Sequence, residues 1–408
     1  MRAKKGLLVL ACAVCVCIIS WVPSYAADIL KIGVIAPMTG PCAETGEGMK
    51  GASILAAEEI NAAGGILGRK IELFFGDDES KAAAGASVME RLINRDKVDI
   101  IIGTMNTNVG LATMEVAAKY EIPFILTCPA AWKISEKILN DPKKYRYTIK
   151  TDPSTYGYGI GYAEFVQYLD GNNLVEFRNR TVAVLSEHND WGASLAEAEV
   201  KEFKKLGWEV VANEVHDIAE TNFFSLLSKI KALNPDILIT NETSASAAAS
   251  LARQFLEQGL PMHLFQSYGA LKPGYLEALG TSGNGICAMQ LIYCHTEECD
   301  EFTGRYAARW GAAKFDVCGN MQYDMFYLAK TAYEKAGSLD KDKWIEAVLN
   351  TEMRGTIGNY VYDKASHETK VGKDFIPSVV MQLRNGKWHY MMPEYMRKEE
   401  YIKPSWVK

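Results

Sequence analysis

The feature that most constrains the fold of this chain is a pattern of short apolar runs alternating with amphipathic runs, repeated in two long blocks. Runs such as VDIIIG at 98–103 are short and almost continuously apolar, as in parallel strands that are buried on both faces. The pattern predicts strands at 30–36, 71–75, 98–102, 123–126, 182–185, 208–215, 236–240 and 262–265, and helices at 47–63, 82–94, 109–119, 194–206, 223–233 and 245–258. The sequence therefore predicts an α/β protein with two doubly wound, Rossmann-like units.

Length and charge restrict the possibilities further. The 408 residues exceed the roughly 250–300 at which single cores stop growing, which favours two domains. The formal net charge is −6, and no basic cluster appears that could neutralise a phosphate backbone. We therefore expect no nucleic-acid partner.

The N-terminus has the three parts of an export signal. Basic residues at 2–5 precede an almost wholly apolar stretch at 6–22, and Ser24-Tyr25-Ala26 offers small residues for cleavage. We expect residues 1–26 to be a cleaved signal peptide and the mature protein to be periplasmic. Two alternatives remain open, a membrane anchor over 6–22 and a lipoprotein attached through Cys12.

Six cysteines would remain after cleavage. The grouping of Cys287, Cys294, Cys299 and Cys318 suggests one disulfide among them in an oxidising compartment. The run from Cys294 to Cys299 also contains histidine and glutamate, but a structural zinc normally needs two properly spaced ligand pairs. We expect no metal and no cofactor.

The motifs of common catalytic sites are missing. No strand is followed by Gly-x-Gly-x-x-Gly, and neither a phosphate-binding loop, a Gly-x-Ser-x-Gly elbow nor His-Glu-x-x-His occurs. Ser338 and Lys341 match Ser-x-x-Lys, but Ser338 follows a glycine at a helix boundary, where serine commonly caps. An enzyme is therefore not expected.

The loops after the strands carry residues suited to binding. Parallel sheets bind ligands beyond the carboxyl ends of their strands. Hydroxyls, amides, one carboxylate and aromatic rings occur there, at Thr45, Asn106, Thr107, Trp132, Trp191, Glu242, Thr243 and Tyr268. Such residues suit a small polar ligand that is held without chemistry, because aromatic walls exclude water while a few polar groups orient the ligand.

Several segments resemble the periplasmic binding proteins of ABC importers for branched-chain amino acids, amides and related acids. The most specific are KIGVIAPMTGP at 31–41 and AEEINAAGGI at 57–66. The others are Asp77-Asp78, Ile102-Gly103, 127–131, 189–192, 234–236 and Tyr323-Asp324, so the resemblance covers nearly the whole mature chain.

The resemblance implies two lobes that close over a ligand about a hinge of three crossings. Matching segments place these crossings near Lys150-Thr151, Gln290 and Pro377. Lobe 1 would then comprise 27–150 plus 291–377, and lobe 2 would comprise 151–290 plus 378–408. The segment 388–408 is expected to be a tail on the surface of lobe 2.

The resemblance also assigns ligand contacts. Thr107 and backbone groups at Ala130 and Trp132 would hold a ligand carboxylate, although Trp132 replaces a hydroxyl of leucine-binding members. Trp191 matches the aromatic lid, whereas the acid that pairs with a ligand ammonium aligns with Tyr268. Glu242 could replace this acid, although a one-residue gap leaves open whether Glu242 or Thr243 occupies the matching position. These departures favour an aromatic or other small carboxylate as the ligand.

The same resemblance implies an ABC permease as the partner and a monomeric protein. Cys42 and Cys128 lie on two loops expected to face the cleft, where they could form a bridge or line the pocket. Two rival functions remain: a sensory protein whose closed form engages a membrane receptor, and an exported hydrolase. The missing nucleophile and metal motifs disfavour the hydrolase.

Overall fold

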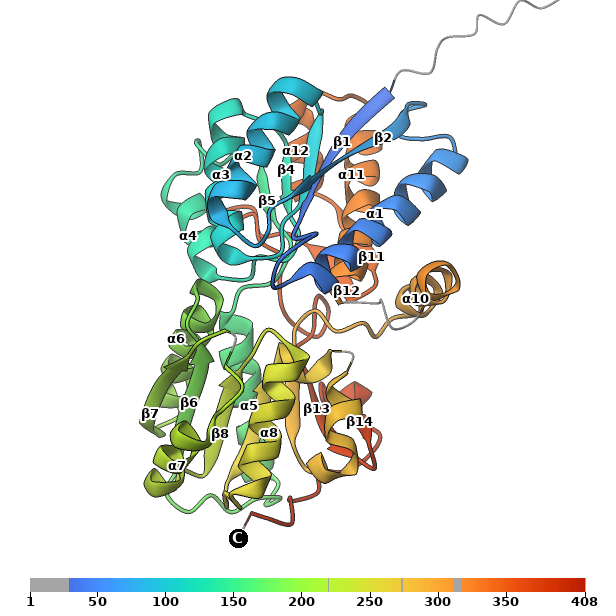
Figure 1. The fold of residues 1–408 in the computed structure, drawn as a ribbon. Helices are drawn as coiled ribbons and strands as arrows, with labels where there is room; N and C mark the ends of the chain where they lie inside the picture. Colours follow the sequence, from blue (N-terminus) through green and yellow to red (C-terminus); the bar gives the residue numbers. More distant parts are fainter. Residues whose placement is uncertain (1–28, 219, 273, 312–316, 408) are drawn as a thin grey trace, which may run out of the picture.

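Two β-sheets, each assembled from strands far apart in the sequence, organise this chain (Figure 1). The computed structural model describes residues 29–407 except 219, 273 and 312–316. The expected signal peptide at 1–26 lies outside these residues. Within them, no helix combines the length and the apolar character that a membrane crossing requires.

The first sheet is wholly parallel, in the order β2-β1-β3-β4-β5. Its strands are β1 (Ile29–Ala36), β2 (Lys70–Asp77), β3 (Ile100–Gly103), β4 (Phe124–Leu126) and β5 (Thr148–Lys150). They alternate with helices α1 (Ala43–Ala62), α2 (Ala82–Arg91), α3 (Thr107–Tyr120) and α4 (Trp132–Asn140), and a π-helical turn at Leu92–Asp96 continues α2. Every residue of β3 is buried, as its apolar run predicts.

The second sheet has the order β14-β13-β10-β9-β8-β6-β7 and is parallel except at β13 and β14. Its strands are β6 (Thr181–Glu187), β7 (Glu209–His216), β8 (Ile237–Asn241), β9 (His263–Ser267), β10 (Cys287–Gln290), β13 (Val379–Arg384) and β14 (Lys387–Met392). The helices with it are α5 (Tyr156–Gly171), α6 (Asp190–Lys205), α7 (Phe224–Leu233), α8 (Ala245–Glu257) and α9 (Tyr275–Leu279).

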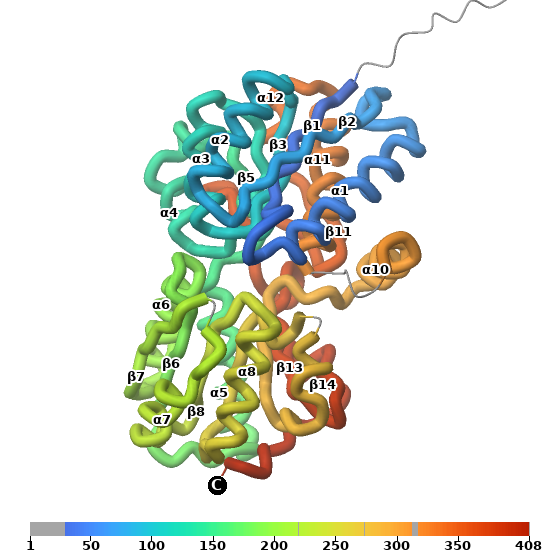
Figure 2. The backbone as a smooth tube through the Cα atoms, in the orientation of Figure 1, coloured from blue at the N-terminus to red at the C-terminus, as the bar shows by residue number. Residues whose placement is uncertain are grey.

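The chain passes between the two sheets three times (Figure 2). It leaves the first sheet after β5 and returns after β10 with α10 (Glu297–Trp310), α11 (Val317–Ala336), α12 (Lys341–Leu349) and the hairpin of β11 (Glu352–Gly355) and β12 (Gly358–Val361). Helix α11 packs against α1 and β3, and β13 then rejoins the second sheet. The predicted class, two Rossmann-like units joined by a three-strand connection, is confirmed.

One turn shows how local sequence ends an element. Helix α1 is followed by Gly64 and Gly65, which have φ angles of 110° and 85°. A Cβ atom at Gly65 would lie 1.9 Å from the carbonyl oxygen of Arg69, so only glycine fits there. The two glycines thus end the helix and direct the chain into β2.

The C-terminal segment differs from the expected surface tail. Residues 387–392 form β14, which pairs antiparallel with β13 at the edge of the second sheet. The Tyr401 side chain is buried, with its hydroxyl 2.9 Å from Nδ1 of His263, and the indole of Trp406 donates to the carbonyl of Met262. Residues 387–392 therefore belong to the second sheet, and Tyr401 and Trp406 contact residues at the start of β9 and just before it.

Candidate functional site

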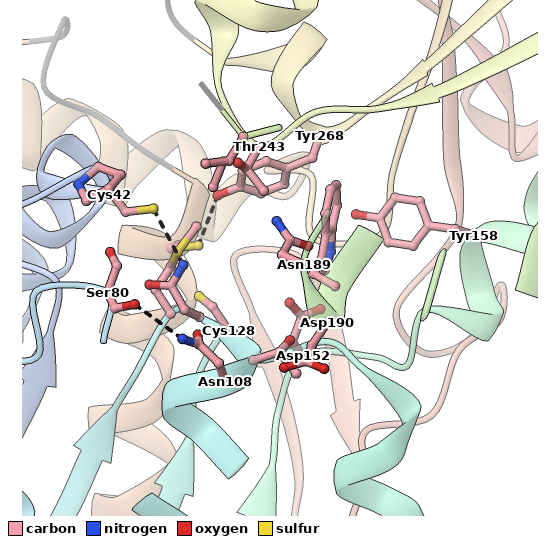
Figure 3. A pocket seen from close by; sticks show the side chains of 17 residues that line it. Cys42, Ser80, Asn108, Cys128, Asp152, Tyr158, Asn189, Asp190, Thr243 and Tyr268 are labelled. Atoms are coloured by element: carbon pink, nitrogen blue, oxygen red, sulfur yellow. Dashed lines mark hydrogen bonds between the residues drawn. The ribbon is translucent and has the colours of Figure 1, made fainter. Parts of the chain in front are cut away.

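A cavity of about 390 Å³ lies where the carboxyl ends of the two sheets meet (Figure 3). Its size falls in the usual range of small-molecule sites. The lining comes mainly from residues that directly follow strands, as expected for doubly wound sheets. These are Pro41, Cys42, Ser80, Met105, Asn106, Thr107, Asn108, Cys128 and Asp152 after strands of the first sheet, Asn189, Asp190, Trp191, Ile218, Thr243 and Tyr268 after strands of the second, and Tyr158 and Cys318 from α5 and α11.

The start of helix α3 supplies one polar part of the cavity. Asn106 is the N-cap residue, and its side chain accepts no capping hydrogen bond. The first N–H groups of a helix have no intrahelical acceptors. The Thr107 hydroxyl and the Asn106 side-chain oxygen are buried and make no hydrogen bond within the described chain. An unused hydroxyl beside a helix N-terminus is well suited to an anionic group such as a carboxylate.

Asp152 supplies a second polar part. It follows β5, is 5% exposed, and its backbone N–H donates to the carbonyl of Thr127 at 3.1 Å. Burial raises the pKa of this carboxyl well above its usual range, and nearby Glu368 raises it further, whereas Lys150 opposes the shift. Among the described residues that line the cavity, none is lysine, arginine or histidine. The carboxyl side chains of the described lining are those of Asp152 and Asp190.

Aromatic rings and sulfur-containing side chains form two further parts of the lining. Trp191 and Tyr268 stand edge to face, with ring centroids 6.1 Å apart, and Tyr158 adds a third ring. The other part consists of sulfur-containing side chains, those of Met105, Cys42, Cys128 and Cys318. The sulfur atom of Cys318 lies 3.2 Å from the Tyr268 hydroxyl. Aromatic and sulfur-containing surfaces both pack well against apolar or aromatic ligand bodies.

A buried acid holds part of the second-sheet wall in place. Glu187 accepts hydrogen bonds from the backbone N–H and hydroxyl of Thr243 and from the side chain of Asn189, at 2.8–3.0 Å. Burial raises the pKa of Glu187, and Thr243 and Asn189 both line the cavity. Glu187 therefore orients two cavity residues without lining the cavity itself.

Glu242 lies behind this wall and not in the cavity lining, which differs from its expected place beside a ligand. It is fully buried, accepts a hydrogen bond from the Thr240 hydroxyl at 2.9 Å and has an oxygen 3.7 Å from Nε2 of His216. Burial lowers the pKa of His216, but Glu242, the backbone of Asp217 and the charge of Glu187 together raise it overall. The carboxylate is thus engaged by protein groups next to β8.

Because its folded-state pKa is raised, the charged form of His216 stabilises the fold below the unfolded pKa, and this stabilisation is lost as pH rises through the folded value. We expect the stability lost on His216→Gln to be larger at pH 6 than at pH 8, measured by urea unfolding. His188→Gln, at an exposed position, is the control and should show no such difference. Equal losses for His216→Gln at both pH values would contradict the ion pair.

Three other expected site residues also lie outside the lining. The Thr45 hydroxyl, on α1, accepts a hydrogen bond from Lys272 at 3.0 Å. The carbonyl of Ala130 accepts from the N–H of Thr155. The Trp132 indole, at the start of α4, donates to Glu197 on α6 at 3.1 Å, because the first turn of α4 directs the ring toward α6. These contacts join elements of the two sheets.

The sequence-based candidates that the structure brings together at the cavity are Asn106, Thr107, Trp191, Thr243 and Tyr268. Asp152 and Tyr158 were missed, although the wholly buried Lys150 beside Asp152 lies at an expected hinge crossing. Figure 3 shows Cys42, Ser80 and Asn108 on one side of the view and Tyr158 on the other, with Asp152 between them.

The cysteines follow the expectations in part. Cys294 and Cys299 form a disulfide, which confirms one bridge within the C-terminal group. Cys42 and Cys128 are not disulfide-bonded in this structure, and both line the cavity. No group of three metal-ligating side chains occurs in the described residues.

The sequence pattern of the periplasmic binding proteins matches residues 29–384. This chain belongs to the periplasmic binding protein family. The Leu/Ile/Val-binding protein homolog 2 of Brucella abortus is 27% identical over 285 residues, which cover 69% of this chain and 71% of that protein. As a periplasmic binding protein, the chain belongs to an extracytoplasmic class whose members bind solutes for ABC transporters and are not enzymes.

Solved structures agree on the fold. A Silicibacter pomeroyi protein described as a branched-chain amino acid ABC transporter superposes with a TM-score of 0.84 at 24% identity, covering 93% of this chain and all of that one. A Rhodopseudomonas palustris solute-binding protein in complex with benzoate has a TM-score of 0.75 at 19% identity, covering 93% of this chain and 99% of that one. At these identities the likeness shows the fold alone. It is the fold of a solute-binding protein with two lobes.

Proposed function

We propose that this periplasmic binding protein captures a small zwitterionic organic acid and delivers it to an ABC permease. Thr107 and the start of α3 hold the carboxylate of the ligand, Asp152 holds its amine, and the aromatic and sulfur-bearing walls cover an apolar body. The observation that carries this proposal is the buried Asp152 carboxylate in a cavity whose described lining contains no cationic side chain.

The spacing of the strands supports this pose. Strands β3 and β5 are separated only by β4, so their ends lie about 10 Å apart. Thr107 follows β3 and Asp152 follows β5, and both line the cavity. A molecule of amino-acid size can therefore reach both side chains at once, since each contributes its own reach and a hydrogen bond.

The two lobes close over the ligand by rotating about a hinge. Residues 27–150 with 291–377 move against 151–290 with 378–408 about crossings near Lys150-Thr151, Gln290 and Pro377. Contacts between elements of the two sheets, such as Lys272 with Thr45 and Trp132 with Glu197, are compatible with a closed form. The protein acts as a monomer after removal of residues 1–26, and the closed form is what the permease recognises.

A second ligand class is an aromatic carboxylate without an amine. Three aromatic side chains in the lining, Tyr158, Trp191 and Tyr268, favour it. Asp152 would then face the ligand in its protonated form, which burial promotes. Amine-bearing and amine-free acids of the same shape distinguish the two classes.

A thermal-shift screen of the mature protein tests the proposal, because a ligand that binds only the native state raises the melting temperature. The set pairs leucine with 4-methylpentanoate and phenylalanine with 3-phenylpropanoate, and adds benzoate. We expect a larger shift for the amine-bearing member of at least one pair. Shifts only with the amine-free acids would select the second class, and no shift with any of them would contradict both.

Thr107→Val tests the carboxylate contact, since valine keeps the shape and removes the hydroxyl. A hydrogen bond to a charged group contributes about 1.5–3 kcal/mol, so the Kd for the zwitterion should rise about tenfold or more. The measurement is isothermal titration calorimetry. A ligand amine lacking the carboxylate should bind both proteins equally, and an unchanged Kd for the zwitterion would contradict the assignment.

A further inference from the structure

A buried ion pair lies directly behind Asp152. Lys150, the last residue of β5, is fully buried, and its Nζ lies 3.3 Å from Oε1 of Glu368, whose side chain is 14% exposed. The two segments are also joined by backbone hydrogen bonds, from the N–H of Lys150 to the carbonyl of His367 and from the N–H of Thr369 to the carbonyl of Lys150. Burying two charges is costly unless both are well paired, and such pairs add little to stability.

The pair holds the backbone on both sides of Asp152. The ammonium group of Lys150 donates to the backbone carbonyl of Asp152. The carboxylate of Glu368 accepts from the backbone N–H of Ser154 and from the hydroxyl of Ser135 on α4. The segment from 150 to 154 leads out of the first sheet, so the two buried charges hold the crossing from which the Asp152 side chain enters the cavity.

We propose that Lys150 and Glu368 are positioning residues that fix the direction and the charge of the Asp152 side chain, and thereby its preference for the amine of the ligand. The preference for an amine rests on the proposed function. The effect of Lys150 and Glu368 on Asp152 does not rest on it, because this effect is a property of the ligand-free protein.

The two partners act on Asp152 with opposite sign. Burial raises the pKa of Asp152, Lys150 lowers it and Glu368 raises it. The other titratable groups of the described cavity lining stay the same in every variant. They are Tyr158 on α5, Asp190 on α6, Tyr268 after β9 and the thiols of Cys42, Cys128 and Cys318. Removing the charge of Lys150 or of Glu368 should therefore move the pKa of Asp152 in opposite directions.

The first experiment follows the Asp152 carboxyl carbon by NMR in the ligand-free protein, with the signal assigned through Asp152→Asn. Relative to the wild type, the pKa should rise in Lys150→Met and fall in Glu368→Gln. A merely structural role would loosen the site in both variants and move the two values the same way. Shifts in one direction, or none, would overturn the proposal.

The second experiment measures the ratio of affinities for phenylalanine and 3-phenylpropanoate by calorimetry. We expect Lys150→Met to lower this ratio about tenfold, as couplings of this kind typically do, and Lys150→Arg to restore most of it. Equal losses for both ligands would indicate a structural role and overturn the proposal. Lys341→Met is the control, because Lys341 forms an exposed pair with Glu121 outside the cavity.

Two safeguards keep the outcomes distinct. If Lys150→Met does not fold because Glu368 is left buried and unpaired, the double variant Lys150→Met/Glu368→Gln removes both charges together. It should fold and show a ratio that is lowered less than in Lys150→Met, because Lys150 acts on Asp152 more strongly than Glu368 does. An unchanged ratio would overturn the proposal. If the wild type shows no preference for the amine, the proposed ligand class fails. The NMR titration still decides whether Lys150 and Glu368 control the charge of Asp152.

Discussion

Asp152→Asn is expected to remove most of the affinity for amine-bearing ligands while leaving the protein folded. Breaking a buried ion pair by removing one partner costs about 3 kcal/mol or more, which corresponds to a Kd at least about 100-fold higher. The carboxylate makes no side-chain hydrogen bond to a described residue, and burial already disfavours its charge, so the ligand-free protein should be as stable as the wild type or more stable. Calorimetry and thermal unfolding measure the two effects.

The amine-free analogue provides the internal control for this variant. The affinity of the amine-free analogue should be unchanged or improved. In the wild type Asp152 must take up a proton to face this ligand, whereas the asparagine amide is already neutral. Asp190→Asn is the matched protein control, since Asp190 also lines the cavity but is 40% exposed and lies 3.8 Å from Lys133. A similar loss for both ligands, or for both variants, would remove Asp152 from its proposed role.

Trp191→Ala is expected to weaken every ligand of the cavity, with or without an amine. The indole is half-buried, lines the cavity and meets Tyr268 edge to face, so truncation opens one wall to water. Buried aromatic residues at binding sites commonly contribute about 2 kcal/mol or more, which predicts a Kd at least about 30-fold higher. The melting temperature of the ligand-free protein should change little, because the ring is only partly buried in the fold.

Trp132→Ala is the informative comparison. This ring also joins elements of the two sheets, through its bond to Glu197 and its packing on Tyr156, but it lies outside the cavity lining. We expect a much smaller effect on the Kd than for Trp191→Ala. If the two variants were equally impaired, the aromatic wall would not be where the lining places it.

Much of the fold could be predicted because buried parallel strands have a distinctive sequence. The isoleucine run of β3 and the apolar run within β6 are recognisable without any partner strand, since both faces of each strand are covered. The edge strand β14 was missed because it is mostly half-buried and carries lysine, histidine and aromatic residues. Only the antiparallel pairing with β13 makes it a strand.

The candidate site was harder to predict, because it depends on where side chains point. Thr107 and Trp191 follow strongly predicted strands, so their places at the sheet edge could be anticipated. Asp152 follows β5, which has only three residues and no clear apolar run. Glu242 was misplaced because its neighbours in β8 and the facing His216 draw its carboxylate behind the wall, which no local pattern reveals.

A crystal structure of the protein with the best compound of the screen would show whether a ligand lies between Thr107 and Asp152. We expect the ligand carboxylate at the Thr107 hydroxyl and the start of α3, and its nitrogen within hydrogen-bond distance of Asp152. A ligand in the cavity with its nitrogen turned away from Asp152, or a ligand bound elsewhere, would contradict this pose.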